Sequence, residues 1–292
     1  MSTLIQGISQ TGQSRFLTRF RSNPFAIPSV LMILVFVVIA VGTALLSSFG
    51  HQWPCDPNLT NLEQKLLPPS SLHWLGTDNL GRDVLSRMLH GAYISLTVGV
   101  VAVSVSLGIG VLVGAVSGYF GGMTDQILMR TVDALLCFPT FFLILTVVAI
   151  LGPSLLNIVI IIGLVSWTGT ARLVRAEFLT LRETEYVKGA RVLGQKSWKI
   201  IMHHILPNAA APILVTAILG IPDAILSEAG LSFLGFGVQP PQATWGNIIA
   251  DGKTYLLYAW WLNLFPGLAI LIASLSFYLA GDALREAAEG RD

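Results

Sequence analysis

The stretch that decides the fold is "YISLTVGVVAVSVSLGIGVLVGAVSGY", which occupies residues 93–119. It contains no Lys, Arg, Asp or Glu in any of its 27 positions. A helix needs about 20 mostly apolar residues to cross the hydrocarbon core of a bilayer. The stretch is therefore predicted to form a membrane-spanning helix.

The composition of the whole chain agrees with this prediction. Of its 292 residues, 53% are hydrophobic and 11% are charged, and its mean hydropathy is +0.71. Soluble domains carry about 25% charged residues, so this chain has too little charge to cover a water-facing surface. A net charge of +1 argues against nucleic acid as a partner. Cys55 and Cys137 are too few for a disulfide framework and are interpreted as free.

Further apolar runs of comparable length accompany this stretch. None shows the alternation of a barrel strand, and each is too long for one. We therefore predict an all-α integral membrane protein with six transmembrane helices, preceded by a segment at 1–26 and followed by a tail at 282–292. The runs form a transmembrane domain at 27–281 and are Ile27–Phe49, Tyr93–Tyr119, Asp133–Leu151, Leu155–Leu173, Asn208–Glu228 and Ala259–Ala280.

Lysine and arginine predict the orientation of these helices, because they collect on the cytoplasmic side of membrane proteins. Together the two termini and the segments 120–132 and 174–207 hold 13 of them, allowing a residue or two at each span end. The segments 50–92 and 229–258 hold 4. We therefore expect both termini in the cytoplasm and these last two segments outside, where their prolines, glycines and aromatic residues indicate folded loops.

The second run carries a ribbon of small residues that recur every four positions and so share one helix face. Small side chains allow two membrane helices to approach closely. The pattern does not say whether the neighbouring helix belongs to the same chain or to a partner subunit, and both readings stay open. The ribbon consists of Ala102, Ser106, Gly110, Gly114 and Gly118.

Two of the predicted spans contain an internal proline, Pro139 in the third and Pro222 in the fifth. Proline removes a backbone hydrogen bond and bends a helix. Each bend is either a static kink or a hinge in a moving pathway. The static kink is the simpler interpretation, because proline is common in membrane helices.

Two carboxylates, Asp223 and Glu228, lie near the outer end of the fifth run. Acids inside a membrane are costly and rarely face lipid. At about 100° per residue the two point roughly 140° apart, so they do not form one paired acid site. Asp223 is the deeper of the two, and we hypothesise that it lines a pathway. Glu228 either lines the same pathway, reaches water at the interface, or caps or bonds a neighbouring helix while Asp223 faces the pathway.

The sequence offers no convincing catalytic or ligand site. "GNIIADGKT" at 246–254 resembles a phosphate-binding loop, but its glycines have the wrong spacing and it falls on the outer side. His203 and His204 are adjacent and cannot both face one metal ion from a regular helix. We therefore expect a non-enzymatic chain that binds no metal or cofactor of its own.

The segment 174–207 is charged, yet it keeps apolar residues at helical spacing. One set includes Tyr186, Val187, Ala190 and Leu193, and a second includes Trp198, Ile201 and Ile205. This pattern predicts two short amphipathic helices, with Gly194 in the turn between them and Pro207 at the end of the second. A short amphipathic helix can bury its apolar face in a partner's groove or on the lipid surface, and periodicity does not decide between these.

Several motifs give the chain a family resemblance. "EYVKGARVLG" at 185–194 and "ILPN" at 205–208 resemble the cytoplasmic loop of ABC-importer permeases of the dipeptide/oligopeptide/nickel branch. Further similar segments are "HWLGTDNLGRDVLSRMLHGAYISL" at 73–96, "LSFLGFGVQPPQATWG" at 231–246, "FPGLAI" at 265–270 and "GDALR" at 281–285. The resemblance extends from about Asn23 to Arg285.

The match to the general family pattern is incomplete. The ending "EAAEGRD" replaces the usual Asp-Pro pair, which leaves the role of the tail open. The matching positions are Ala190, Gly194, Leu206 and Pro207, whereas Lys188, Gly189 and His204 replace the expected Glu, Ala and Ile.

The resemblance implies a permease subunit in the cytoplasmic (inner) membrane of a prokaryote. It would pair with a homologous second permease, two cytoplasmic ATPase subunits that carry ATP and Mg, and an extracytoplasmic solute-binding protein. The helix around Glu185–Leu193 would be the coupling helix, docked in a cleft of one ATPase. In that helix Tyr186, Val187 and Ala190 would form the packed ridge, and Glu185 and Arg191 would make ionic contacts. Lys188, Gly189 and Gly194 complete the predicted coupling site.

The cargo implied by this branch is a di- or oligopeptide, with nickel, glutathione or another small solute as alternatives. An ion-coupled secondary transporter is a different class, but it would need a midplane site built from repeated halves, and no convincing repeat is visible. A structural or channel-forming membrane protein would not need the amphipathic segment at 174–207.

Overall fold

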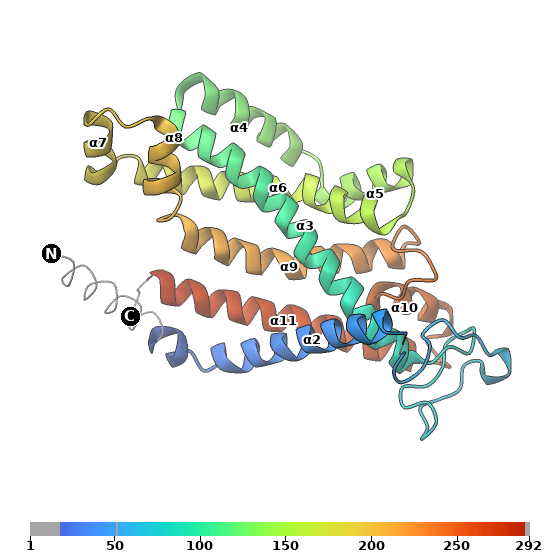
Figure 1. Cartoon of the computed structure of the whole chain (residues 1–292). Coiled ribbons are helices and arrows are strands. Elements are labelled where there is room, and N and C mark those ends of the chain that lie inside the picture. The colour runs from blue at the N-terminus through green and yellow to red at the C-terminus, as the bar shows by residue number, and fades with distance from the viewer. Residues whose placement is uncertain (1–17, 51, 290–292) are drawn as a thin grey trace.

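The chain folds into a bundle of long helices, as shown by a computed structural model that describes residues 18–50 and 52–289 (Figure 1). Within those residues there are helices, turns and one isolated β-bridge, between Thr77 and Asp83. The long helices are α2 Ala26–Ser48, α3 Val84–Phe120, α4 Gly122–Leu136, α5 Thr140–Leu151, α6 Leu155–Leu181, α9 Ala210–Phe233 and α11 Trp261–Glu289. The shorter ones are η1 Leu62–Gln64, α7 Glu185–Val192, α8 Ser197–Ile200, the π-helix η2 Ile201–Ile205, α10 Trp245–Gly252 and η3 Lys253–Tyr255.

The predicted all-α membrane architecture is confirmed. In the described part of the chain, 5 helices are long and apolar enough to cross a membrane, namely α2, α3, α6, α9 and α11. The pair α4 and α5 makes a sixth span if it is counted as one. A bundle of apolar helices suits a bilayer because each helix satisfies its own backbone hydrogen bonds.

The third predicted span, Asp133–Leu151, bends at Pro139 as predicted, but the bend divides it into two helices, and the first of them begins earlier than expected. Helix α4 already begins at Gly122, and α4 and α5 meet at an angle of 81° around Pro139. Proline cannot donate the backbone hydrogen bond that would continue the helix, and it disfavours a helical conformation at Phe138 before it. The second internal proline acts differently, because α9 continues through Pro222 as one helix.

Several helices extend beyond the predicted apolar runs, among them α11, which continues to Glu289. Helix α3 begins at Val84, where the Asp83 side chain accepts a hydrogen bond from the Ser86 backbone N–H at 2.8 Å. Helix α6 continues to Leu181 and α9 to Phe233. Hydropathy marks the part of a helix that lies in lipid, whereas capping side chains set where the helix ends.

The small-residue ribbon of α3 packs against α6 of the same chain. A Cβ on Gly110 would lie 2.6 Å from the Thr170 Cβ, and one on Gly114 would lie 2.5 Å from the Ala171 carbonyl oxygen. A Cβ on Gly118 would lie 2.6 Å from the Phe178 Cβ. Real Cβ atoms do not come this close, so the two backbones meet only because these positions carry glycine.

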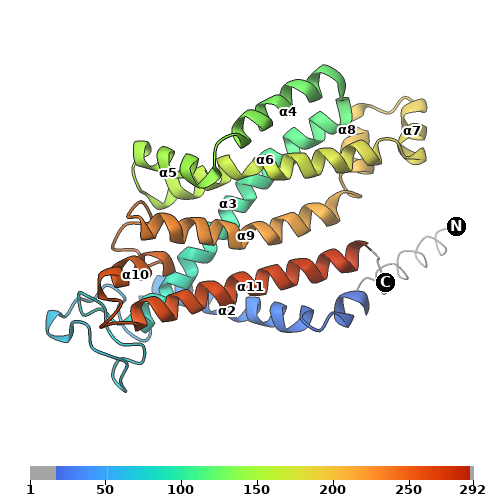
Figure 2. The same ribbon diagram turned by 180° about the vertical axis from the view of Figure 1, so that it is seen from behind.

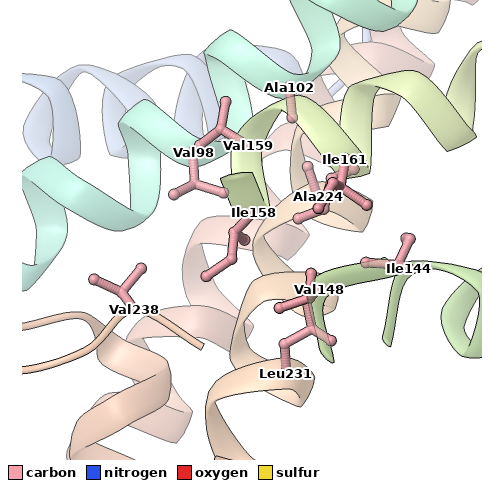
Figure 3. Packing of buried hydrophobic residues seen from close by; sticks show 11 residues of the cluster. Val98, Ala102, Ile144, Val148, Ile158, Val159, Ile161, Ala224, Leu231 and Val238 are labelled. Carbon is pink, nitrogen blue, oxygen red and sulfur yellow. The ribbon is translucent and has the colours of Figure 1, made fainter. Parts of the chain in front are cut away.

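Buried aliphatic residues lock four of the spans together (Figure 3). Val98 and Ala102 of α3 pack with Ile144 and Val148 of α5. The same cluster includes Ile158, Val159, Ile161 and Ile162 of α6, Ala224 and Leu231 of α9, and Val238 in the loop after α9. This cluster fixes α5, and therefore the far side of the Pro139 bend, against α3 and α6.

The two ends of the bundle differ, as both views show (Figures 1 and 2). One end, here called the α7 end, carries α7 and α8, the start of α2 and the end of α11. The other end, here called the α10 end, carries the long segment between α2 and α3 together with α10. Cys55 lies in that segment, and both it and Cys137 are free thiols, as predicted. Burial raises the pKa of the Cys55 thiol.

Candidate functional site

A cavity of about 530 Å³ opens on the bundle between α3, α6, α9 and the bend that joins α4 to α5. Its apolar lining comes from residues such as Ala102, Ile162 and Leu219. Hydroxyl side chains interrupt this lining from all sides. They belong to Ser106, Thr140, Ser166, Thr168, Thr170, Thr216 and Ser227. A hollow of this size with scattered polar groups is typical of sites that hold small solutes.

Asp223 lies on the wall of this cavity, where the sequence predicted a pathway residue. Because α9 ends at Phe233 rather than at Glu228, Asp223 sits about 15 Å from that end at 1.5 Å per residue, well inside the span. Its Oδ1 accepts a hydrogen bond from the Tyr278 hydroxyl of α11 at 2.5 Å. The Asp223 side chain is exposed, so its carboxylate faces the hollow rather than the packed interior.

Glu228 bonds a neighbouring helix, which is one of the alternatives that the sequence left open for these two acids. It is 0% exposed and does not belong to the cavity lining, so it neither faces this hollow nor reaches water. Its Oε1 accepts hydrogen bonds from the Ser232 hydroxyl at 2.7 Å and the Thr244 hydroxyl at 2.9 Å. Thr244 caps the N-terminus of α10. Glu228 therefore joins α9 to α10 inside the protein.

The α7 end contains the two short helices that the apolar spacing predicted. Gly194 has a φ of +72° in the turn between them, a conformation that glycine adopts at little cost. Helix α7 ends in this turn, where the Gln195 N–H donates to the Ala190 carbonyl at 3.1 Å. The second segment combines α8 with η2 and ends before Pro207.

The predicted ridge of α7 is divided between two faces. Val187 and Ala190 are buried in a cluster with Tyr119, Phe178 and Ile200, so they attach α7 to its own chain and are not available to a partner. This corrects the expectation that both would contact another subunit. A helix of eight residues cannot stay folded alone, so part of its apolar face must be buried within the same chain.

The opposite face of α7 is open. Tyr186 is exposed, and Val192 and Leu193 are 88% and 81% exposed. The Arg191 guanidinium lies 5.3 Å from the centre of the Tyr119 ring. Trp198, from the apolar set of the second helix, is also exposed. The remaining predicted coupling residues, Glu185, Lys188, Gly189 and Gly194, are exposed as well.

A buried charge cluster at the α10 end was missed by sequence reasoning. Asp78 Oδ2 accepts from Arg82 Nε and from Arg87 Nη1, both at 2.6 Å. Arg82 and Arg87 also pair with Asp251 Oδ2, at 3.0 and 2.8 Å. The cluster ties the segment before α3 to α10. Asp78 and Arg82 at i and i+4 were a visible signal, but Asp251 joins them only through the fold.

A second ion pair fixes the first half of the bent span. The Arg175 guanidinium of α6 donates from Nε and Nη2 to the two oxygens of Asp125 in α4, at 2.5 and 2.6 Å. The Ser117 hydroxyl of α3 donates to the same carboxylate. Such two-point pairs between guanidinium and carboxylate are strong and directional. Helix α4 is therefore attached to α6 and α3 on its side of the Pro139 bend.

Comparison with known proteins places the chain in a family. Residues 110–291 match the family model described as binding-protein-dependent transport system inner membrane component. A dipeptide transport system permease protein of Alkalihalophilus pseudofirmus is 41% identical over 92% of this chain and 86% of its own length. An oligopeptide transport system permease protein of Bacillus subtilis is 40% identical over the same shares.

Two further similarities agree with that placement. A glutathione transport system permease protein of Pectobacterium atrosepticum is 37% identical over 95% of this chain and 91% of its own length. The methionine ABC transporter MetNI, in an inward-facing conformation, has a chain with the same fold, with a TM-score of 0.58 at 18% identity. That match covers 70% of this chain and 97% of the other. The protein therefore belongs to the binding-protein-dependent transport system inner membrane components, the permease subunits of ABC importers.

Proposed function

We propose that this permease carries di- and oligopeptides across the inner membrane through a pathway that it forms with a second, homologous permease chain. The observation that carries the proposal is the cavity beside Asp223. The hydroxyl groups of the cavity lining can form hydrogen bonds with the amide groups of a peptide that passes through. The proposed cargo follows from the names of the relatives, which are permeases for dipeptides, oligopeptides and glutathione. Glutathione is itself a small peptide.

The proposal assigns the α7 end to the cytoplasm and the α10 end to the outside. The excess of lysine and arginine in the segments at the α7 end supports this orientation. Both termini then lie in the cytoplasm. A solute-binding protein would deliver the cargo at the α10 end, where the buried cluster around Asp78 holds the long loop in a fixed shape.

Two separate ATPase subunits would bind and hydrolyse ATP with Mg beneath the α7 end. The surface proposed to meet one of them, here called the α7 surface, consists of Tyr186, Val192, Leu193 and Trp198, which are apolar and exposed. Apolar helix faces of this kind dock into grooves of partner proteins. Glu185 and Arg191 at its edge remain the proposed ionic contacts. Val187 and Ala190 hold α7 to the bundle, so a force on the α7 surface is passed to α3 and α6.

The test is to reconstitute the permease pair with its ATPases and binding protein, and to compare Leu193→Arg with Leu257→Arg. Both leucines are more than 80% exposed, at 81% and 88%, but Leu193 directly follows α7, whereas Leu257 lies between η3 and α11, just after α10. Leu193→Arg places a charge at the centre of the α7 surface, and we expect recovery of the ATPases in mild detergent to fall at least about tenfold, as for a central interface residue.

Leu257→Arg should leave the recovery of the ATPases unchanged. Equal recovery with both variants would contradict the docking assignment. Peptide uptake that persists without ATP but stops when ion gradients are dissipated would identify a secondary transporter and overturn the proposed function as a whole.

A further inference from the structure

The cavity has an uncompensated negative charge. Asp223 is the one acid in its lining, and the lining residues include no Lys or Arg. Among the described residues, the hydrogen bond that Asp223 makes through its carboxylate comes from Tyr278, a neutral hydroxyl group. A carboxylate inside a membrane is expensive unless it faces water or a cationic partner. A neutral residue such as Asn, Ser or Ala at position 223 would avoid this cost, yet the chain has Asp there.

The geometry keeps this charge available. Tyr278 donates to Oδ1 at 2.5 Å and so orients the carboxylate without neutralising it, while no described residue donates a hydrogen bond to Oδ2. The Ser227 hydroxyl lies one turn further along α9 on the same wall. It donates its hydrogen bond to the Asp223 backbone carbonyl at 2.7 Å rather than to the Asp223 side chain. The carboxylate therefore has an acceptor free for a group that arrives in the cavity.

We propose that Asp223 receives an ammonium group of the cargo as it passes through the cavity. This inference rests on the proposed peptide cargo and adds a specificity-determining residue to it. A peptide carries an ammonium group at its amino terminus, and some carry a second on a lysine side chain. Away from bulk water, a charge pair is much stronger than at an exposed surface. Asp223 would then lower the barrier for cations relative to anions.

Tyr278 acts as a positioning residue in this arrangement. It touches the carboxylate rather than the cargo, and it comes from α11, on the other side of α9 from the cavity helices α3 and α6. Removing the Tyr278 hydroxyl leaves the Asp223 charge in place but no longer fixes the orientation of the carboxylate. The variant Tyr278→Phe should therefore weaken the cation preference less than Asp223→Asn does.

The experiment measures uptake of tripeptides into proteoliposomes that contain the complete importer, with saturated binding protein. The peptides have the form Ala-X-Ala, where X is Lys, Ala or Glu. For each peptide the rate of wild type is divided by the rate of Asp223→Asn, an almost isosteric change that removes the charge. Differences in how the binding protein selects peptides cancel in this ratio.

We expect the ratio to be about tenfold where an ammonium group is recognised, a factor in the range measured for single charge pairs. If the lysine side chain is the group, the ratio is large for X = Lys and near one for X = Glu. If the amino terminus is the group, the ratio is similar for all peptides at about pH 6.5 and falls towards one at about pH 8.5. At that pH the terminus, with a pKa of about 7.7–8.0, is mostly neutral and lysine is not.

The matched control is Asp133→Asn, which makes the same carboxylate-to-amide change at an exposed residue outside the cavity lining and should give ratios near one at both pH values. A ratio for Asp223→Asn that is the same for all peptides and independent of pH would overturn the inference, as would no effect at all. If wild type hydrolyses ATP but moves none of the peptides, the proposed cargo is wrong and the inference falls with it. The wild-type control thus separates the two failures.

Discussion

At the scale of single residues, the contrast between buried and exposed charges decides which ion pairs matter. Asp78 and Arg87 are fully buried at the α10 end, whereas Glu183 and Lys188 form an exposed pair at 3.5 Å near α7. Removing one partner of a buried pair leaves the other charge without solvent or counter-ion. When an exposed pair is broken, water solvates both groups, so the protein loses little stability.

Asp78→Asn should therefore destabilise the protein strongly, by roughly 3–5 kcal/mol, because Arg82 and Arg87 would then share Asp251 alone. Glu183→Gln should cost less than about 1 kcal/mol. The measurement is the midpoint of thermal unfolding of each purified variant in mild detergent. Similar midpoints for the two variants would show that the buried cluster does not hold the loop before α3 in place.

Burial also separates residues that share one sequence pattern. Val187 and Leu193 belong to the same apolar spacing, yet Val187 is 0% exposed and Leu193 is 81% exposed. The spacing identifies a helix with an apolar side but does not say which part of it the chain itself covers. The position of α7 against Tyr119 and Phe178 makes that choice.

At the scale of elements, the contact between α3 and α6 is made by backbone proximity rather than by large side chains. Gly114 meets the Ala171 carbonyl, whereas Gly108 on the same helix has no atom within 4 Å of a Cβ placed there. The two glycines therefore have different reasons to be present, although both stand in one apolar run.

Gly114→Ala should destabilise the protein by about 1–3 kcal/mol, the usual cost of overpacking a tight contact. Gly108→Ala should be neutral or stabilising by up to about 1 kcal/mol, because alanine is the better helix former. Thermal unfolding in detergent compares the two. If Gly108→Ala proved as harmful as Gly114→Ala, helix flexibility rather than close packing would explain the ribbon.

The bent pair α4 and α5 is a second case in which neighbours complete what one residue begins. Pro139 interrupts the helix, but the 81° angle is held by contacts on both sides of it. Asp125 of α4 pairs with Arg175 of α6, and Ile144 of α5 packs into the cluster shown in Figure 3. These contacts also place Leu136 and Thr140 on the cavity wall.

At the scale of the whole molecule, the α7 surface and the cavity are linked through shared helices. Helix α7 packs on the cluster that contains Val174 and Phe178 of α6. Helix α6 also lines the cavity, with Ile162 and Ser166. A displacement of α7 is therefore passed to the cavity wall through a rigid, packed element.

Gly194→Pro should break this link, because proline fixes φ near −65° and Gly194 needs +72°. In the reconstituted importer we expect ATP hydrolysis to continue while peptide uptake falls at least about tenfold, since a misplaced contact costs that much or more. The matched control is Lys196→Pro, because Lys196 has a φ of −62° that proline can adopt. Uptake by Gly194→Pro at the level of this control would contradict the role of α7 in coupling.

The sequence alone was enough for the architecture and the family. Apolar runs of about 20 residues force helices in a bilayer, because backbone groups there must be satisfied internally. The spans α2, α3, α6, α9 and α11 were therefore found with errors mainly at their ends. The two short helices around Gly194 were also found, because helical spacing and a glycine turn are both local signals.

Only the tertiary structure decided which residues meet. It buried Glu228 beside Thr244, brought Asp251 to Arg82 and Arg87, turned Val187 inward, and bent the third span into two helices. It also set Asp223 on the wall of a cavity next to Tyr278, 55 positions away in the chain. Hydropathy and periodicity depend on neighbours in sequence, whereas burial and ion pairing depend on neighbours in space, which exist only once the helices have packed.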